Sequence, residues 1–129
     1  MPTVRDVMST ALLTVDSTEN LTDAAHQMHE RGVGAALVLN GETLSGILTE
    51  RDVLRAVATG EVAGTKVGAW MTHDPETIEP GERPAQAAAI MLHGGFRHLP
   101  VVEAGTPIGI VSIRDLMRVV IDDESPRGA

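Results

Sequence analysis

The segment Gly46-Ile-Leu-Thr-Glu-Arg-Asp52 recurs later in the chain as Gly109-Ile-Val-Ser-Ile-Arg-Asp115. The correspondence extends outward from this motif, and residues 4–55 align with residues 67–118 without a gap. A repeat of this length indicates one supersecondary unit that is used twice. We expect the two copies to fold together, because each half of a 129-residue chain would be only marginally stable alone.

Hydrophobic spacing predicts the order strand, helix, strand, strand, helix in each copy, which is an α+β fold. In the first copy, Leu21, Ala24 and Met28 fall on one face of a helix. In the second copy, Pro84 stands at the first helical position, where proline is favoured. The apolar runs 36–39 and 45–49, and their counterparts 99–102 and 108–112, predict two β-hairpins. Short helical lead-ins are expected at 4–8 and 67–71, and brief strands at 13–15 and 77–78.

These elements divide the chain into a first repeat at residues 1–60, a linker at 61–66, a second repeat at 67–121 and a polar, disordered tail at 122–129. No apolar run approaches the roughly 20 residues that cross a bilayer, and the N-terminus lacks a signal-peptide pattern. The absence of cysteine excludes disulfides and thiolate metal sites. We therefore expect a cytoplasmic protein with no membrane partner.

The charge of the chain argues against nucleic acid as a partner. The formal net charge is −8, whereas binding to a phosphate backbone needs clustered Lys and Arg. Trp70 and Phe96 are the only aromatic residues, too few for a base-stacking platform. A local basic spot could still hold a small phosphate.

The repeated motif places a hydroxyl, Thr49 or Ser112, at the end of a strand, and an aspartate, Asp52 or Asp115, in the first turn of the helix that follows. One interpretation is a capping box, in which hydroxyl and carboxylate only satisfy the helix N-terminus. The other is a ligand site, since a carboxylate there can accept two hydrogen bonds from a ribose diol, and the helix N-terminus favours a phosphate. The duplication of the whole motif favours the second interpretation.

We find no pattern typical of an enzyme or of a metal centre. The motif places no histidine that could activate Ser112 or Thr49 as a nucleophile, and no phosphate-binding glycine loop with lysine occurs. His26 and His29 are spaced i, i+3, but no third ligand accompanies them, so a solvated helix face explains them better than a metal does.

The chain resembles a tandem pair of CBS domains, the regulatory module named after cystathionine β-synthase and also called a Bateman module. The resemblance covers residues 4–121 and rests on the two glycine-to-aspartate motifs and on these segments: Asp6-Val-Met8, Thr14-Val15, Ala24-Ala25 with Met28, Gly32-Val33 and Leu99-Pro-Val-Val102. It implies two β-α-β-β-α repeats packed with pseudo-two-fold symmetry, two clefts that often bind adenosine-containing ligands, and frequent dimerisation.

The resemblance also implies two sets of ligand-binding residues, each drawn from both repeats. The first set is Thr10, Leu13, Val33, Gly34, Arg97, Ile110, Ser112 and Asp115; the second is Ile47, Thr49, Asp52, Thr72, Glu76 and Phe96, with Arg97 again. We expect the first cleft to bind more strongly, because Arg97 aligns with Gly34 in the other repeat and a guanidinium is a strong phosphate partner.

The resemblance predicts a stand-alone regulatory or sensor protein that binds AMP, ADP, ATP or S-adenosylmethionine and requires no cofactor. A homodimer is implied as a partner. Because no catalytic domain is attached, we expect the chain either to report to a separate target protein or to act as a nucleotide buffer. The alternative is a dimerisation or scaffold module that binds no ligand and acts through protein–protein contacts.

Overall fold

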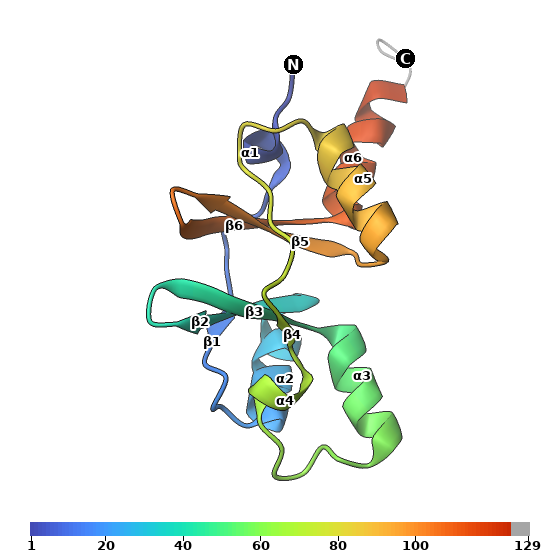
Figure 1. Cartoon of the computed structure of the whole chain (residues 1–129). Helices are drawn as coiled ribbons and strands as arrows, with labels where there is room; N and C mark the ends of the chain where they lie inside the picture. Colours follow the sequence, from blue (N-terminus) through green and yellow to red (C-terminus); the bar gives the residue numbers. More distant parts are fainter. Residues whose placement is uncertain (125–129) are drawn as a thin grey trace. The chain divides into compact units, whose positions relative to one another are not determined.

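The computed structural model describes residues 1–124 and has the predicted α+β architecture, with one helix-covered β-sheet in each half of the chain (Figure 1). The elements follow in this order: α1 (Val4–Val7), β1 (Thr14–Val15), α2 (Leu21–Arg31), β2 (Ala35–Asn40), β3 (Thr43–Thr49), α3 (Glu50–Thr59), α4 (Val67–Trp70), β4 (Thr72–His73), α5 (Pro84–Gly94), β5 (His98–Glu103), β6 (Thr106–Ser112) and α6 (Ile113–Glu124).

The chain forms two compact units whose boundaries differ from those of the sequence repeats. The central unit comprises residues 11–75, and the C-terminal unit comprises residues 1–10 together with the described residues from 76 onward. Each unit thus contains the lead-in helix of the other repeat. The Val4 amide donates to the Glu82 carbonyl at 2.8 Å, and the Val67 amide donates to the Glu19 carbonyl at 2.9 Å.

The central unit is built on a four-stranded sheet with the order β1-β2-β3-β4. Strand β1 is parallel to β2, with Thr14 opposite Leu37, and the remaining pairs are antiparallel. Helices α2 and α3 pack against β2 and β3. The core includes Leu48 of β3, Ala56 of α3 and Val67 of α4, the lead-in helix that comes from the second repeat.

The C-terminal unit is built on the β5-β6 hairpin, whose pairing continues to His98 and Ser112. The strand predicted at 77–78 is reduced to one parallel bridge between Ile78 and Val101. Helix α1 contacts α5, α6 and β6, so the N-terminal segment is an integral part of this unit. Val4 is completely buried in its core.

The ends of the elements follow the local sequence. Gly32 and Gly95 end α2 and α5 with positive φ angles of 64° and 72°, a conformation that suits glycine. The predicted linker, residues 61–66, contributes Val62 to the packing around the central core. Helix α6 runs to Glu124, so residues 122–124 are helical, contrary to the predicted tail; residues 125–129 lie outside the described part. Among the described residues, no helix has the length and apolar character needed to span a membrane.

Candidate ligand-binding site

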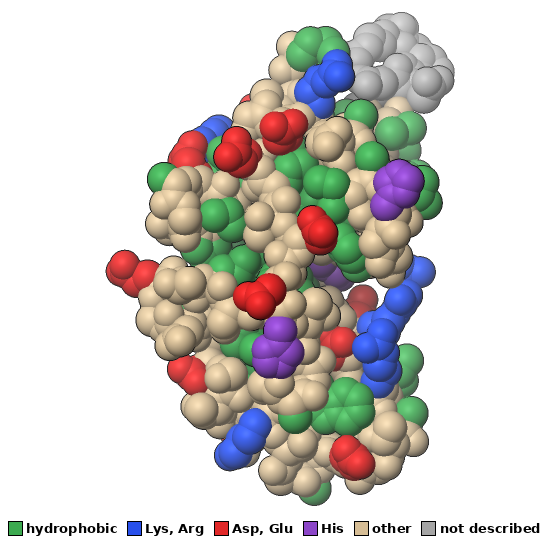
Figure 2. Space-filling model, in the orientation of Figure 1, with side chains coloured by type: hydrophobic (Ala, Val, Ile, Leu, Met, Phe, Trp, Pro, Cys, Tyr) green, Lys and Arg blue, Asp and Glu red, His purple; other side chains and the backbone are tan. Residues whose placement is uncertain are grey.

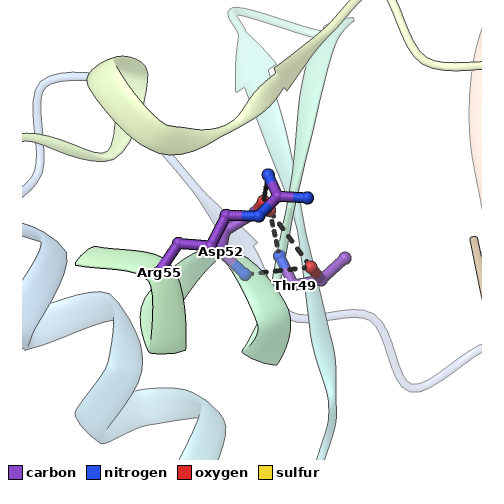
Figure 3. A network of polar contacts seen from close by, with 3 residues as sticks. All are labelled: Thr49, Asp52 and Arg55. Carbon is purple, nitrogen blue, oxygen red and sulfur yellow. Dashed lines mark hydrogen bonds and ion pairs between the residues drawn. The ribbon is translucent and has the colours of Figure 1, made fainter. Parts of the chain in front are cut away.

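Both repeated motifs lie where a strand of the hairpin turns into the following helix. At the β3–α3 junction, the Thr49 amide donates to Asp52 Oδ2 at 2.9 Å, and the Asp52 amide donates to Thr49 Oγ1 at 3.4 Å (Figure 3). At the β6–α6 junction, the Ser112 amide donates to Asp115 Oδ2 at 2.8 Å, and the Asp115 amide donates to Ser112 Oγ at 3.1 Å. The capping interpretation of the motif is therefore confirmed at both junctions.

The capping bonds occupy only one oxygen of each carboxylate. The other oxygen, Oδ1, faces an arginine three residues later on the same helix. The Arg55 Nη1 atom lies 3.6 Å from Asp52 Oδ1, and the Arg118 Nη1 atom lies 3.3 Å from Asp115 Oδ1. Capping by Oδ2 thus leaves the Oδ1 side of the aspartate as the face from which a ligand could approach.

The two junctions differ in the exposure of the aspartate and in the hydrogen bonds that the hydroxyl makes. The Asp52 side chain is 5% exposed, whereas that of Asp115 is 16% exposed. The Thr49 hydroxyl donates to Asp52 Oδ2 at 3.1 Å, whereas the Ser112 hydroxyl donates to no atom of the described residues. The β6–α6 junction therefore offers a free hydroxyl donor and a more accessible carboxylate.

The backbone also brings Arg97 to the β6–α6 junction. The Ile113 amide, the first of α6, donates to the Arg97 carbonyl at 2.9 Å, and His98 pairs with Ser112. The Arg97 side chain is exposed, and its guanidinium forms no ion pair with any other side chain that the structure describes. The equivalent carbonyl in the central unit belongs to Gly34 and accepts the Glu50 amide at 3.0 Å. Glycine has no side chain, so this junction lacks the positive charge that Arg97 provides.

The exchange of lead-ins accounts for one member of each predicted ligand-binding set. Ser9 exchanges two backbone hydrogen bonds with Ile110, of 2.8 and 3.0 Å, so Thr10 belongs to the same unit as Ser112. In the central unit, Thr72 pairs with Ile47 in the equivalent way. Each unit thus contains a hydroxyl residue, a branched apolar residue and the capping pair. The sequence repeats alone assign Thr10 and Thr72 to the opposite copies.

The remaining predicted residues divide between the units. Leu13, Val33 and Gly34 lie in the central unit, whereas Glu76 and Phe96 lie in the C-terminal unit. The Leu13 side chain is buried in the core of its unit, and Val33 packs against that core. Phe96 likewise packs against the core of the C-terminal unit and covers Gly94. The side chains of Leu13 and Phe96 therefore have a structural role within their own units.

Sequence reasoning did not single out two features of the junctions. The first is the arginine that covers each aspartate, although Arg55 and Arg118 are identical in the aligned repeats. The second is the structural role of the motif glycine, Gly46 in the first copy and Gly109 in the second. A side chain at Gly46 would stand 2.7 Å from Met71 Sδ and 2.8 Å from the Thr72 carbonyl oxygen. The glycine therefore lets the exchanged lead-in lie directly against the hairpin.

No cluster of three potential metal ligands occurs among residues that the structure describes. His26 pairs with Glu30 at 3.0 Å on the exposed side of α2. Hydrogen bonds from Thr18 hold the pKa of Asp16 below its ordinary value, in the loop that precedes α2. Neither feature lies at the β3–α3 or the β6–α6 junction.

Comparison with known proteins identifies the repeated unit. The CBS domain family model matches the chain twice, at residues 4–59 and 67–122. The CBS domain-containing protein YhcV of Bacillus subtilis is 32% identical over 130 residues, which cover 100% of this chain and 93% of that protein. A 17.7 kDa protein of Acidianus ambivalens is 34% identical over 121 residues, covering 92% of this chain and 73% of the relative.

Solved structures of the same kind match nearly the whole chain. A CBS-domain protein from Burkholderia ambifaria superposes with a TM-score of 0.89 at 34% identity, covering 98% of this chain and 99% of that one. CBSX2 of Arabidopsis thaliana, solved in complex with AMP, superposes with a TM-score of 0.82 at 28% identity, covering 97% and 100%.

Proposed function

The chain belongs to the CBS domain family as a tandem pair, and we propose that it is a regulatory protein that binds an adenosine-containing small molecule. The observation that carries the proposal is the β6–α6 junction, where Ser112, Asp115 and Arg97 come together from the ends of two paired strands and the start of one helix. The AMP complex of CBSX2 supports the class of ligand.

Each group at the junction has a role in the proposed binding. The Asp115 carboxylate accepts hydrogen bonds from the two hydroxyls of a ribose, which are strong because the acceptor is charged. The free Ser112 hydroxyl and the N-terminus of α6 favour a phosphate. Arg97 adds a guanidinium without a competing ion pair in the described part of the chain, so we expect AMP, ADP or ATP to bind better than S-adenosylmethionine.

The equivalent β3–α3 junction is the weaker candidate. Its carboxylate is nearly buried, its hydroxyl already donates to Asp52, and Gly34 replaces the arginine. A ligand there that needed the Thr49 hydroxyl or Asp52 Oδ2 would have to break the Thr49–Asp52 hydrogen bond. We therefore propose one principal adenosine site per chain.

Calorimetric titration with AMP, ADP, ATP and S-adenosylmethionine tests the proposal. Asp115→Ala should weaken nucleotide binding by ten- to a hundredfold. This loss corresponds to about 1.5–3 kcal/mol, the free energy that a hydrogen bond to a charged group contributes. Asp52→Ala is the matched control, because it removes the same kind of capping carboxylate from the other repeat. Equal losses in the two variants would contradict the asymmetry. If none of the four compounds bound the unmodified protein, the proposed function itself would be wrong.

A second candidate function, assembly through protein–protein contacts, is favoured by apolar side chains at the surface of both units (Figure 2). On α6, Ile113, Met117 and Val120 are 38–53% exposed at a spacing of i, i+4 and i+7, and α3 exposes Leu54 and Val57. Such a stripe packs well against a copy of itself. We propose that it forms a homodimer interface, which is compatible with ligand binding.

The proposed dimer is tested by measuring the molar mass of the protein with light scattering as it elutes from a size-exclusion column. Met117→Glu should shift the mass from dimer toward monomer, because it buries a charge in the proposed interface. Leu92→Glu, at an exposed position on α5, is the control for the added charge. A dimer without affinity for any adenosine compound would favour the scaffold function; a monomeric unmodified protein would exclude it.

A further inference from the structure

Each capping aspartate is covered by an arginine of its own helix. In the central unit, the Arg55 side chain reaches back along α3 and holds its guanidinium beside the Asp52 carboxylate (Figure 3). In the C-terminal unit, Arg118 Nη1 donates to Asp115 Oδ1 at 3.3 Å. The same residue type at the same spacing in both repeats shows that the arrangement is built into the repeated unit.

The arginine occupies the oxygen that a ligand would need. Asp115 Oδ2 already accepts the Ser112 amide at 2.8 Å, so a sugar diol must use Oδ1 for at least one of its hydroxyls. We propose that Arg118 is an internal competitor at this oxygen, and that the diol binds by displacing its guanidinium. The inference rests on the proposed adenosine site and adds a residue that sets its affinity.

The exposure of the two side chains indicates that this competition tunes binding without preventing it. The Arg118 side chain is 67% exposed, so its guanidinium can exchange Asp115 for water, whereas Asp115 is 16% exposed and is held by its capping bonds. Ion pairs with so exposed a partner are weak. We therefore expect Arg118 to reduce the affinity for a diol by about two- to fivefold, which moves the ligand concentration at which the protein responds.

Adenosine is the probe that isolates the competition, because it carries the diol but no phosphate for an arginine to attract. Arg118→Gln should raise the affinity for adenosine by about two- to fivefold. Arg114→Gln removes the same charge from the same helix and should leave the affinity unchanged. Raising the salt concentration should increase the affinity of the unmodified protein for adenosine, because salt screens the competing pair, and should have no such effect on Arg118→Gln.

A measurement without ligand tests the contact itself. In ¹⁵N relaxation of the arginine side chains, the Nε–H group of Arg118 should be more ordered in the unmodified protein than in Asp115→Asn. Equal mobility in the two proteins, or an adenosine affinity that stays the same or falls in Arg118→Gln, overturns the competition alone. If adenosine and AMP both fail to bind the unmodified protein, the competition fails together with the proposed function.

Discussion

The thioether of Met8 lies directly against Gly109, at the middle of β6, where any side chain would collide with the sulfur. The contact joins the first residues of the chain to the second copy of the repeated motif, and it continues into the paired hydrogen bonds between Ser9 and Ile110. The glycine of the motif thus serves the docking of the lead-in, whereas the hydroxyl and the aspartate serve the helix and the proposed ligand.

Gly109→Ala should therefore destabilise the protein. The added methyl group would meet Met8 Sδ and would lie 3.1 Å from the Ser9 carbonyl oxygen, so the Met8 side chain must move aside and the Ser9 backbone must give way slightly. Overpacking of this kind costs about 1–3 kcal/mol, measurable as a lower midpoint of urea unfolding. Gly81→Ala is the control, since no atom lies within 4 Å of its added methyl group. Equal midpoints for the two variants would contradict the docking role of Gly109.

The exchange of lead-ins predicts which unit a core mutation will loosen. Val4 and Val67 are matched in the repeats and completely buried, but Val4 lies in the core of the C-terminal unit and Val67 in that of the central unit. We expect Val4→Ala to speed amide hydrogen exchange in β5, β6 and α5, and Val67→Ala to speed it in β2, β3 and α2.

The two valine variants are controls for each other, because they make the same cavity in equivalent places. The reverse pattern, with Val4→Ala loosening residues 14–59, would show that each repeat folds with its own lead-in. Uniform loosening by both variants would show that the two units unfold as one.

The elements and the motif were predictable because their signals are local. The face formed by Leu21, Ala24 and Met28 gave α2, and the spacing between Thr49 and Asp52 gave a capping box that the structure confirms. The exchange of lead-ins was not predictable from the repeat, because an alignment matches residues 4–8 to 67–71 without saying which sheet each segment packs against.

The family resemblance already grouped Thr10 with Ile110, Ser112 and Asp115, and the bridge between Ser9 and Ile110 gives the physical reason why Thr10 lies in the same unit as these residues. The contacts of Arg55 and Arg118 with the aspartates are different, because an i, i+3 spacing on a helix is itself a local signal that brings the two side chains together. The identity of the two arginines was apparent from the aligned repeats, but this spacing rule was not applied to them.

The different use of the two hydroxyls predicts unequal effects on stability and binding. Thr49 caps α3 and also donates to Asp52, so Thr49→Ala should cost about 1–2 kcal/mol of stability and have little effect on nucleotide affinity. Ser112→Ala should cost about 1 kcal/mol of stability and also weaken AMP binding, because its hydroxyl is the free donor. Denaturant unfolding and calorimetry on both variants separate the two effects. A loss of AMP affinity that is larger in Thr49→Ala would place the principal site at the other junction.

Arg97 distinguishes the two repeats most clearly, and its proposed partner is a phosphate. Arg97→Gln should weaken AMP binding by about tenfold or more, as expected for the loss of a hydrogen bond between charged groups. The same change should leave adenosine affinity unaltered, since the nucleoside has no phosphate. The AMP affinity of the unmodified protein should fall as salt rises, and this dependence should be weaker in the variant.

An equal loss of affinity for AMP and adenosine would instead mean that Arg97 supports the fold of the junction, where its carbonyl accepts the first amide of α6. Arg83→Gln, at an exposed position before α5, is the control for the change in net charge.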